Sequence, residues 1–350
     1  MTPKHNINSL LATAVPEVTV REAERMAAEF YGLDAVATEL KGERDRNFHL
    51  RTGDGRHFVL KIGNTAEDRE VTHFQTQALL HIESRDAALP VPRVLRTRAG
   101  EAEVVLGRPG EAPRILRILT YLQGEPLHRV PRSPVQRRNL GACLARLDRA
   151  LQGFSHPAAD YELLWDLKQA ARVRGLLVHI TDDQRRALAT SFLDAFERHA
   201  LPAMTALRMQ IVHNDMNPHN VLVRPDATDE IAGIIDFGDA VRAPLVNDLA
   251  VAAAYQLTET GHPLEGPGDM LAGYHAVLPL EPEEIDILFD LLATRMVLTV
   301  AIGSWRAARY PENREYIMRN SPVAWAGLER LSGLSRAEAQ DYLHRICDEE

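Results

Sequence analysis

Hydrophobic residues recur with two different spacings along the chain, and the change of spacing separates two regions. In the first region, short alternating apolar runs predict β-strands, which lie at residues 35–40, 47–51, 57–62, 104–105 and 115–122. Helical spacing in this region predicts helices over residues 17–31 and 66–83. In the second region the spacing is mostly helical, and it predicts helices at 135–152, 162–177, 183–200, 246–257, 269–277, 282–303 and 335–347.

The two regions meet in a stretch rich in proline and glycine, residues 121–134. Such a stretch ends regular structure, so we place the junction there. The predicted organisation is an α+β fold of two lobes, a small β-rich lobe over residues 1–120 and a larger, mostly helical lobe over residues 121–350. One segment of the helical region is an exception, because β patterns return at residues 211–236.

Composition narrows the class of protein. The formal net charge of −9 argues against nucleic acid as the main partner. Cys143 and Cys347 are the only cysteines, too few for a disulfide framework, which favours a reducing compartment. We see no secretory signal and no apolar run near the ~20 residues of a membrane helix, so we expect a cytoplasmic protein without a membrane partner. The basic cluster Arg129, Arg132, Arg137 and Arg138 is interpreted as a solvated surface.

Polar residues with metal-binding and proton-transfer chemistry surround the β segment at 211–236. Asn220 precedes its first strand and Asp236 follows its second, so a hairpin would bring the two side chains together. Both offer hard oxygen atoms, which Mg²⁺ prefers, while it keeps waters and takes other ligands from substrate phosphates. Asp215 lies five residues before Asn220 and is placed to accept a proton from an attacking hydroxyl.

The pattern His-x-Asp-x-x-x-x-Asn at 213–220, followed by Ile-Asp-Phe-Gly at 235–238, resembles the aminoglycoside phosphotransferase and choline kinase superfamily, which has a protein-kinase-like fold. The resemblance implies that Asp215 is the catalytic base and that Asn220 and Asp236 bind Mg²⁺. It makes the first lobe a nucleotide-binding lobe for ATP or GTP, and the second the catalytic and substrate-binding lobe. It further implies Lys61 as the ligand of the α- and β-phosphates, Thr120 and Tyr121 as the hinge that meets the nucleobase, and His213 and Asp248 as supports of the loop.

Two departures from the family pattern concern the nucleotide side. A G-x-G-x-x-G loop is missing, and residues 42–47 stand in its place, where phosphate contacts would come from backbone amides or from Arg44, Arg46 or Asn47. The helix residue that pairs with Lys61 is also ambiguous. Gln75 occupies the sheet-facing position at which family members often carry glutamate, and Glu70 lies on another flank; both stay open.

Three other classes of protein are less consistent with the motifs. A zinc hydrolase using His213, Asp215 and His219 is disfavoured, because the histidine spacing and Pro218 do not fit a helical ligand pair. A pseudokinase is disfavoured by the intact catalytic set. A protein kinase is disfavoured because residues 238–246 are short and contain no Ser, Thr or Tyr.

The acceptor is expected to be a small hydroxylated amine or amino acid. Residues 154–158, 165–167, 238–240 and 305–313 resemble the hydroxylysine kinase branch, while homoserine, ethanolamine, choline and aminoglycosides stay open as acceptors. Asp239 is expected to receive the acceptor amine, unless it caps a turn or pairs with Arg242. Trp165, Asp166 and Trp305 are the other expected acceptor contacts.

Overall fold

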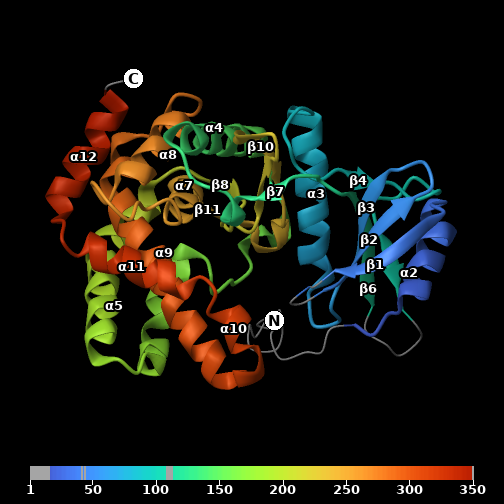
Figure 1. Ribbon diagram of the computed structural model, residues 1–350, viewed down its shortest axis with the longest axis horizontal. Helices are drawn as coiled ribbons and strands as arrows, with labels where there is room; N and C mark the ends of the chain where they lie inside the picture. The colour runs from blue at the N-terminus through green and yellow to red at the C-terminus, as the bar shows by residue number, and fades with distance from the viewer. Residues whose placement is uncertain (1–15, 41, 43–44, 108–112, 349–350) are drawn as a thin grey trace.

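The computed structural model describes residues 16–40, 42, 45–107 and 113–348, and shows an α+β fold (Figure 1). A sheet formed by the N-terminal part stands at one end of the molecule, and the helical part occupies the other. The predicted fold class is confirmed. Among the described helices, none is long and apolar enough to cross a membrane.

The N-terminal sheet is antiparallel and has the order β1-β2-β3-β6-β4, with β5 also paired to β6. Its strands are β1 Ala35–Leu40, β2 Arg46–Thr52, β3 His57–Ile62, β4 Val94–Leu95, β5 Val104–Leu106 and β6 Arg114–Thr120. Alternate residues of β2, β3 and β6, among them Phe48, Leu60 and Ile118, are fully buried. Because side chains alternate across a strand, Lys61 lies between two buried neighbours and turns to the other face.

Two helical segments cover this sheet. Helix α2 (Val20–Met26) starts with a capping box between Thr19 and Glu22 and continues as the π-helical turn Ala27–Tyr31. Helix α3 (Arg69–Arg85) stands between the sheet and the helical part (Figure 1). Its buried residues Phe74, Ala78 and Ile82 belong to the core of the helical part, so α3 joins the two halves.

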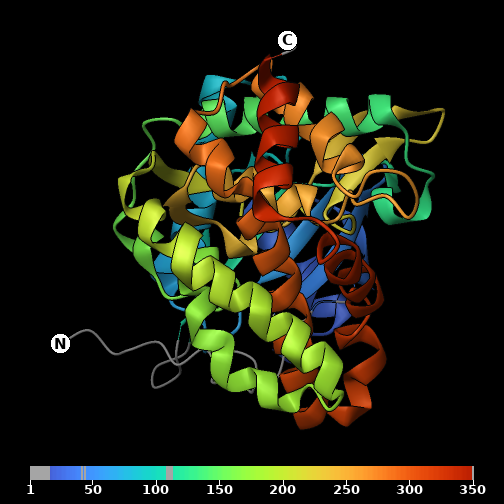
Figure 2. The same ribbon diagram turned by 90° about the vertical axis from the view of Figure 1, so that its left-hand side faces the viewer.

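The helical part is built around α9 (Pro282–Arg309), a 28-residue helix that is buried along most of its length. Figure 2 looks onto the outer side of this half, where α12 lies. The other α-helices are α4 Pro134–Leu151, α5 Asp183–Ala195, α6 Leu201–Ala203, α7 Val246–Ala253, α8 Glu265–His275, α10 Arg314–Ile317, α11 Ser321–Leu331 and α12 Arg336–Asp348. Shorter 3-10 and π segments are Leu127–Arg129, Pro157–Asp160, Leu167–His179, Phe196–Ala200, Met204–Ala206, Phe237–Asp239 and Pro311–Asn313.

Most predicted elements are present, and three of the differences concern the helical part. The segment predicted as a helix from residue 162 becomes helical only at Leu167, where Asp166 caps its first turn, and it has 3-10 geometry. Helix α9 runs six residues further than predicted. Helix α11 was not predicted; it begins with Pro322 in its first turn, a position at which proline favours a helix rather than ending it.

Short strands return inside the helical part, as the β pattern at 211–236 predicts. Strand β8 (Met209–Val212) pairs with β11 (Val241–Pro244), and β9 (Val221–Arg224) pairs with both β10 (Ala227–Ile234) and β7 (Glu125–Pro126). Because β7 pairs with β9, residue 125 already belongs to the helical half. The division after residue 120 remains our proposed boundary between the lobes.

Candidate active site

The loop between β8 and β9, residues 213–220, is anchored to the first turn of α7. Asp248 accepts hydrogen bonds from the amides of His213 (2.8 Å) and Asn214 (2.7 Å) through its two carboxylate oxygens. Asn214 has a left-handed backbone with a φ of 64°, uncommon for a residue other than glycine. The buried Asp248 therefore holds the loop in a conformation that it would not keep alone.

The carboxylate of Asp248 has a second buried acid beside it. Asp148 of α4 is fully buried, and Tyr274 of α8 donates a 2.6 Å hydrogen bond to it. Burial raises the pKa of Asp148 well above its ordinary value, and the neighbouring Asp248 adds to the rise. Asp148 therefore favours its neutral form beside Asp248, and α4 and α8 pack this second acid against the anchor of the loop.

His213 braces the same loop with its ring. Its Nδ1 accepts a hydrogen bond from the Asp215 amide (3.3 Å), and its Nε2 lies 3.1 Å from the carbonyl of Ile235, to which it donates. The ring also packs edge-on against Phe237, with 4.7 Å between centroids. Since both ring nitrogens have partners, His213 is not arranged as a zinc ligand. Within the part of the chain that the structure describes, no group of three or more His, Cys, Asp or Glu side chains is arranged to hold a metal ion.

Asp215 points into the cavity with three donors around its carboxylate. Asn217 (3.0 Å) and Asn220 (2.8 Å) donate to Oδ2, and Arg295 donates to Oδ1 over 2.7 Å. Each carboxylate oxygen has two lone pairs, so Oδ1 retains one for a further donor such as an acceptor hydroxyl. The Asp215 side chain is one-fifth exposed, which leaves it accessible from the cavity.

Arg295 was not predicted as a site residue. It lies on α9 with a side chain only 3% exposed, donates to the carbonyl of Trp165 and the hydroxyl of Tyr255, and lies over the Trp165 ring. The signal for it in the sequence is an arginine inside the apolar run 287–302, since a buried charge in a core helix needs a partner. That partner, Asp215, is 80 residues away and was not deducible from spacing.

The proton affinity of Asp215 is tuned by these surroundings. Burial is the main cause that raises its pKa, and the nearby negative charge of Asp239 acts in the same direction, whereas Arg295 and the hydrogen bond from Asn217 lower it; the net result is a pKa of about 6. A carboxylate of this pKa is mostly ionised at neutral pH and is a stronger base than an ordinary aspartate.

Asn220 and Asp236 are brought together by the hairpin, as predicted. The Ile235 amide donates to the Asn220 carbonyl (2.9 Å), which closes the open end of the hairpin next to Asp236. The Asn220 side-chain amide donates to the carbonyl and carboxylate of Asp215, so its Oδ1 is directed to accept or to bind a cation. Asp236 is exposed to the cavity. This donor set of hard oxygens fits Mg²⁺ that takes its remaining ligands from water and phosphate.

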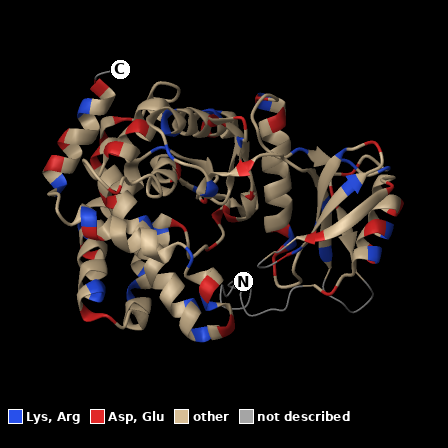
Figure 3. Cartoon of the chain, in the orientation of Figure 1, with Lys and Arg blue, Asp and Glu red and all other residues tan. Residues whose placement is uncertain are grey.

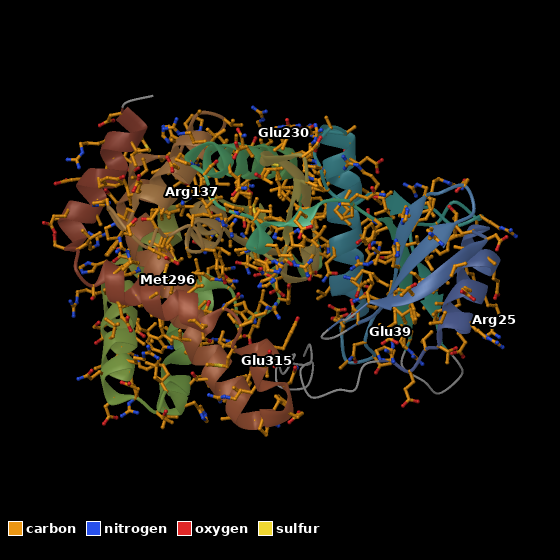
Figure 4. The ribbon with its side chains drawn as sticks, in the orientation of Figure 1. Arg25, Glu39, Arg137, Glu230, Met296 and Glu315 are labelled. Atoms are coloured by element: carbon orange, nitrogen blue, oxygen red, sulfur yellow. The ribbon has the colours of Figure 1, made fainter. Side chains whose placement is uncertain are left out.

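These groups border a cavity of about 580 Å³ between the sheet and the helical half. Figure 4 marks Met296 on α9 and Glu315 on α10, the two helices that line it from the helical half. Lys61, Asp45 and Asn47 line it from the sheet, Gln75 from α3, and Asp215, Asn220, Asp236 and Asp239 from the loops around β9–β11. Figure 3 shows acidic and basic residues intermixed over the outer helices, so in this view the net negative charge is not gathered on one face.

The partner of Lys61 in the structure is neither of the two residues considered from the sequence. Its Nζ lies 3.7 Å from Asp45 Oδ2. Gln75 instead accepts a 2.6 Å hydrogen bond from the buried Arg117 and donates to the carbonyl of Gly238. Glu70 is more than half exposed and lies 3.7 Å from Arg69. Gln75 therefore supports Arg117, which lies opposite Lys61 on β6.

The loop that replaces the glycine-rich motif is only partly described. Asn47 lines the cavity, where it can meet phosphate oxygens. Arg46 donates to the Pro16 carbonyl and pairs with Glu39, so it turns away from that role. The third predicted contact, Arg44, lies outside the described residues.

Thr120 ends strand β6 and Tyr121 follows it, and both backbone amides already donate hydrogen bonds within the protein. Thr120 exchanges hydrogen bonds with the backbone of Arg93, and the Tyr121 amide donates to the His57 carbonyl (3.1 Å). The Tyr121 ring lies 4.5 Å from the His49 ring. A nucleobase contact at this hinge would use carbonyl oxygens, or amides of the following residues 122–124.

The predicted acceptor contacts separate into two groups. Asp239 and Trp165 line the cavity. Asp166 is 1% exposed and is engaged by Lys168, both as an ion pair at 3.3 Å and as the cap of the 3-10 helix that follows, so its role is structural. Trp305 packs against the core of the helical half, and its neighbour Arg306 reaches the cavity instead.

The alternative partner considered for Asp239 is engaged elsewhere. Arg242 donates to both oxygens of Asp160 at 2.9 and 3.1 Å. Asp239 is 8% exposed and lies close enough to influence the titration of both Asp215 and Arg295. Its place in the cavity suits a cationic group of an acceptor.

Comparison with known proteins agrees with this geometry. A model described as the phosphotransferase enzyme family matches residues 37–280. The chain is 26% identical to the hydroxylysine kinase of Mus musculus, over 94% of this chain and 93% of the mouse protein. It is 30% identical to a homoserine kinase of Methylorubrum populi, over 74% and 77% of the two chains. The solved structure of an amicoumacin kinase with AMP-PNP and Ca²⁺ shares the fold, with a TM-score of 0.63 at 15% identity over 85% of this chain and 93% of that one.

Proposed function

This chain belongs to the phosphotransferase enzyme family, and from that premise we propose that it transfers the γ-phosphate of ATP or GTP to a hydroxyl of a small amine or amino acid. The observation that carries the proposal is the meeting of Asp215 with Asn220 and Asp236 in one cavity that Lys61 also lines. Base, metal-binding oxygens and a phosphate-binding cation are the parts that phosphoryl transfer requires.

Each residue has a defined part in the proposed reaction. Asp215 accepts the proton of the acceptor hydroxyl, whose oxygen forms the new bond to the γ-phosphorus while the bond to the β–γ bridging oxygen breaks. Asn220 and Asp236 would hold Mg²⁺, which neutralises charge on the phosphates when bound. Lys61 contacts the phosphates from the sheet, and Arg295 keeps the base oriented and ionised.

A hydroxylysine-like acceptor is favoured by the extent of similarity. The hydroxylysine kinases of mouse and Xenopus laevis align with 94–95% of the chain, whereas the homoserine kinase of Methylorubrum populi aligns with 74%. Homoserine is the second candidate, because that homoserine kinase has 30% identity. Ethanolamine, choline and aminoglycosides are less favoured candidate acceptors.

The test is an acceptor screen with the purified protein. Hydroxylysine, homoserine, ethanolamine, choline and an aminoglycoside are offered with ATP and, separately, with GTP, and nucleoside diphosphate release is measured with and without Mg²⁺. Nucleotide hydrolysis without acceptor is the blank, and phosphorylated product is confirmed by mass spectrometry. Nucleotide binding without any phosphorylated acceptor would indicate a pseudokinase and overturn the proposal.

A further inference from the structure

One end of the cavity is lined by cationic groups rather than by acids. Arg306 comes from the last turns of α9, and Arg319 and Asn320 follow α10. Arg129 and the rings of His128 and His219 complete this end, with 4.1 Å between the two ring centroids. Arg129 belongs to the basic cluster interpreted from the sequence as solvated surface. It borders the cavity, but its side chain is 64% exposed and lies 3.6 Å from Glu125, in agreement with that interpretation. The interpretation was wrong for Arg137, which is 11% exposed and pairs with Asp269.

The arginines carry the positive charge at this end, and burial together with that charge disfavours protonation of the two histidines. Burial lowers the pKa of His219 to about 4, and the positive charge of Arg319 and the adjacent His128 contribute. Burial also lowers the pKa of His128, with further contributions from Arg129, Arg132 and Arg319. The pKa of Arg306 is lowered for the same reasons, burial first and Arg319 among the charges. A concentration of positive charge in a confined space favours binding of an anion.

Helix α9 connects this cationic end to the catalytic base. Arg295 and Arg306 are eleven residues apart, which is about three turns, so they lie on the same face of α9 roughly 16 Å apart along its axis. Thr299, one turn after Arg295, also lines the cavity. One wall of the cavity is therefore formed by α9, from Arg295, which donates to Asp215, to Arg306 at the cationic end.

Two anions are chemically suited to such a site, a nucleotide phosphate and an acceptor carboxylate. The phosphates are already accounted for by Lys61, Asn220 and Asp236. Arg306 and Arg319 instead come from the C-terminal end of α9 and the segment after α10, on the wall that continues beyond the base. An acceptor with its hydroxyl at Asp215 would extend along this wall.

We propose that Arg306 and Arg319 form a carboxylate-binding subsite that selects amino acids over amino alcohols as acceptors. The inference rests on the proposed function and names the chemical class of its acceptor. Guanidinium groups bind carboxylates through paired, charge-assisted hydrogen bonds. With the carboxylate of Asp239 also lining the cavity, the cavity offers opposite charges to the two ends of a zwitterion, whereas choline, ethanolamine and aminoglycosides carry no carboxylate.

The test uses acceptor pairs that differ only in the carboxylate: hydroxylysine with its decarboxylated diamine, and homoserine with 3-aminopropanol. Steady-state kinetics and calorimetric binding are measured for wild type, Arg319→Gln and Arg306→Gln. Arg309→Gln is the control, since Arg309 is an exposed residue of the same helix whose guanidinium contacts Tyr310. Arg319 is exposed at the cavity rim, so its variant is expected to fold even if the Arg306 variant does not.

We expect wild type to prefer the carboxylated member of each pair. Arg319→Gln should raise its KM or Kd about 10–100-fold and leave the decarboxylated member and the nucleotide unchanged. Equal use of both members by wild type, or a variant that weakens nucleotide rather than acceptor, overturns the subsite. Carboxylate-dependent binding without phosphate transfer would instead retain the subsite and reject the proposed function.

Discussion

The catalytic loop and the strand that carries Lys61 face the same cavity, but their side chains are held to different degrees. Asp248 uses both carboxylate oxygens on the loop, His213 uses both ring nitrogens, and Asp215 has three donors. Lys61 has an ion pair with Asp45 at 3.7 Å, which is longer than a hydrogen bond. Asp215, the proposed base, is therefore held in place by its protein partners alone.

This difference between the loop and Lys61 indicates which side chain must be positioned most accurately for the reaction. A base that is 1 Å out of place loses catalysis, so a rigid loop benefits the chemical step. A lysine that binds phosphate oxygens as a point charge tolerates more freedom. We infer that the loop is preorganised, whereas nucleotide completes the arrangement around Lys61. Five experiments test this difference between the loop and Lys61.

Replacing the base should have the largest effect. Asp215→Asn keeps the size of the side chain but removes proton acceptance, so turnover should fall by about 10²–10⁴-fold. Nucleotide affinity should persist, because Lys61, Asn220 and Asp236 remain. Single-turnover kinetics and nucleotide titration check both statements, and near-normal turnover in a folded variant would remove Asp215 from the role of base.

Asp236→Ala tests the metal side of the loop. Asn220 alone is a neutral ligand and binds Mg²⁺ weakly, so the variant should lose the increase in nucleotide affinity that Mg²⁺ causes. The measurement is a nucleotide titration with and without Mg²⁺ for wild type and variant. Retention of the full increase would show that the metal is held by other groups.

Asp239→Asn should raise KM for a cationic acceptor by about 10–100-fold and change nucleotide KM little. Asp160→Asn is the matched control, since Asp160 is exposed and pairs with Arg242. If acceptor KM does not change, or if the best acceptor is a neutral alcohol, Asp239 does not bind the amine.

The pH profile tests how the base is tuned. Asp215 must be ionised to accept a proton, so kcat/KM should fall as the pH drops through about 6. Arg295 stabilises the ionised form, and an opposite charge this close lowers a carboxyl pKa by about 1–3 units. With a rise in the pKa of Asp215 of about 1–2 units, Arg295→Gln should therefore move the acidic limb to higher pH and reduce activity at pH 7 by about two- to tenfold. If the acidic limb of the pH profile does not move in an Arg295→Gln variant of normal thermal stability, Arg295 contributes to packing and does not tune the pKa of Asp215.

Asp45→Asn should have the smallest effect and tests the Lys61 side. The variant loses a loose ion pair and one negative charge near the phosphates, so nucleotide Kd should change by no more than about fivefold. Isothermal titration with nucleotide measures it. A loss of tenfold or more would mean that Asp45 positions Lys61 as firmly as Asp248 positions the loop, and the contrast would be wrong.

The same contrast explains what the sequence predicts well. The catalytic loop and its supports lie within residues 213–248, so spacing and a hairpin were enough to place Asp215, Asn220 and Asp236 together. Arg295 was missed, because its contact with Asp215 depends on how a helix far along the chain packs. For the same reason the burial of Asp166 was not foreseen, because it depends on the surrounding helices although its partner Lys168 is close in sequence.

The nucleotide side was predicted less well for another physical reason. The strand pattern predicts β3, and the family resemblance singles out Lys61 on it. The partner of Lys61 depends on the course of an irregular loop, which has no periodic pattern from which it could be predicted. Gln75 was correctly placed on the inner face of α3. Its bond to Arg117 was not foreseen, because two long polar side chains can each reach several partners.

The length and burial of α9 also bear on how such enzymes diversify. Arg295 and Arg306 occupy one face of a single helix, so substitutions at its C-terminal end can change the molecules that enter while the base stays undisturbed. Insertion of one residue between them would turn Arg306 by about 100° and carry it out of the cavity, whereas insertion of a full turn of three or four residues would keep its direction and lengthen the spacing. New specificities within this architecture are therefore expected to arise by exchange of side chains or by steps of a whole helical turn.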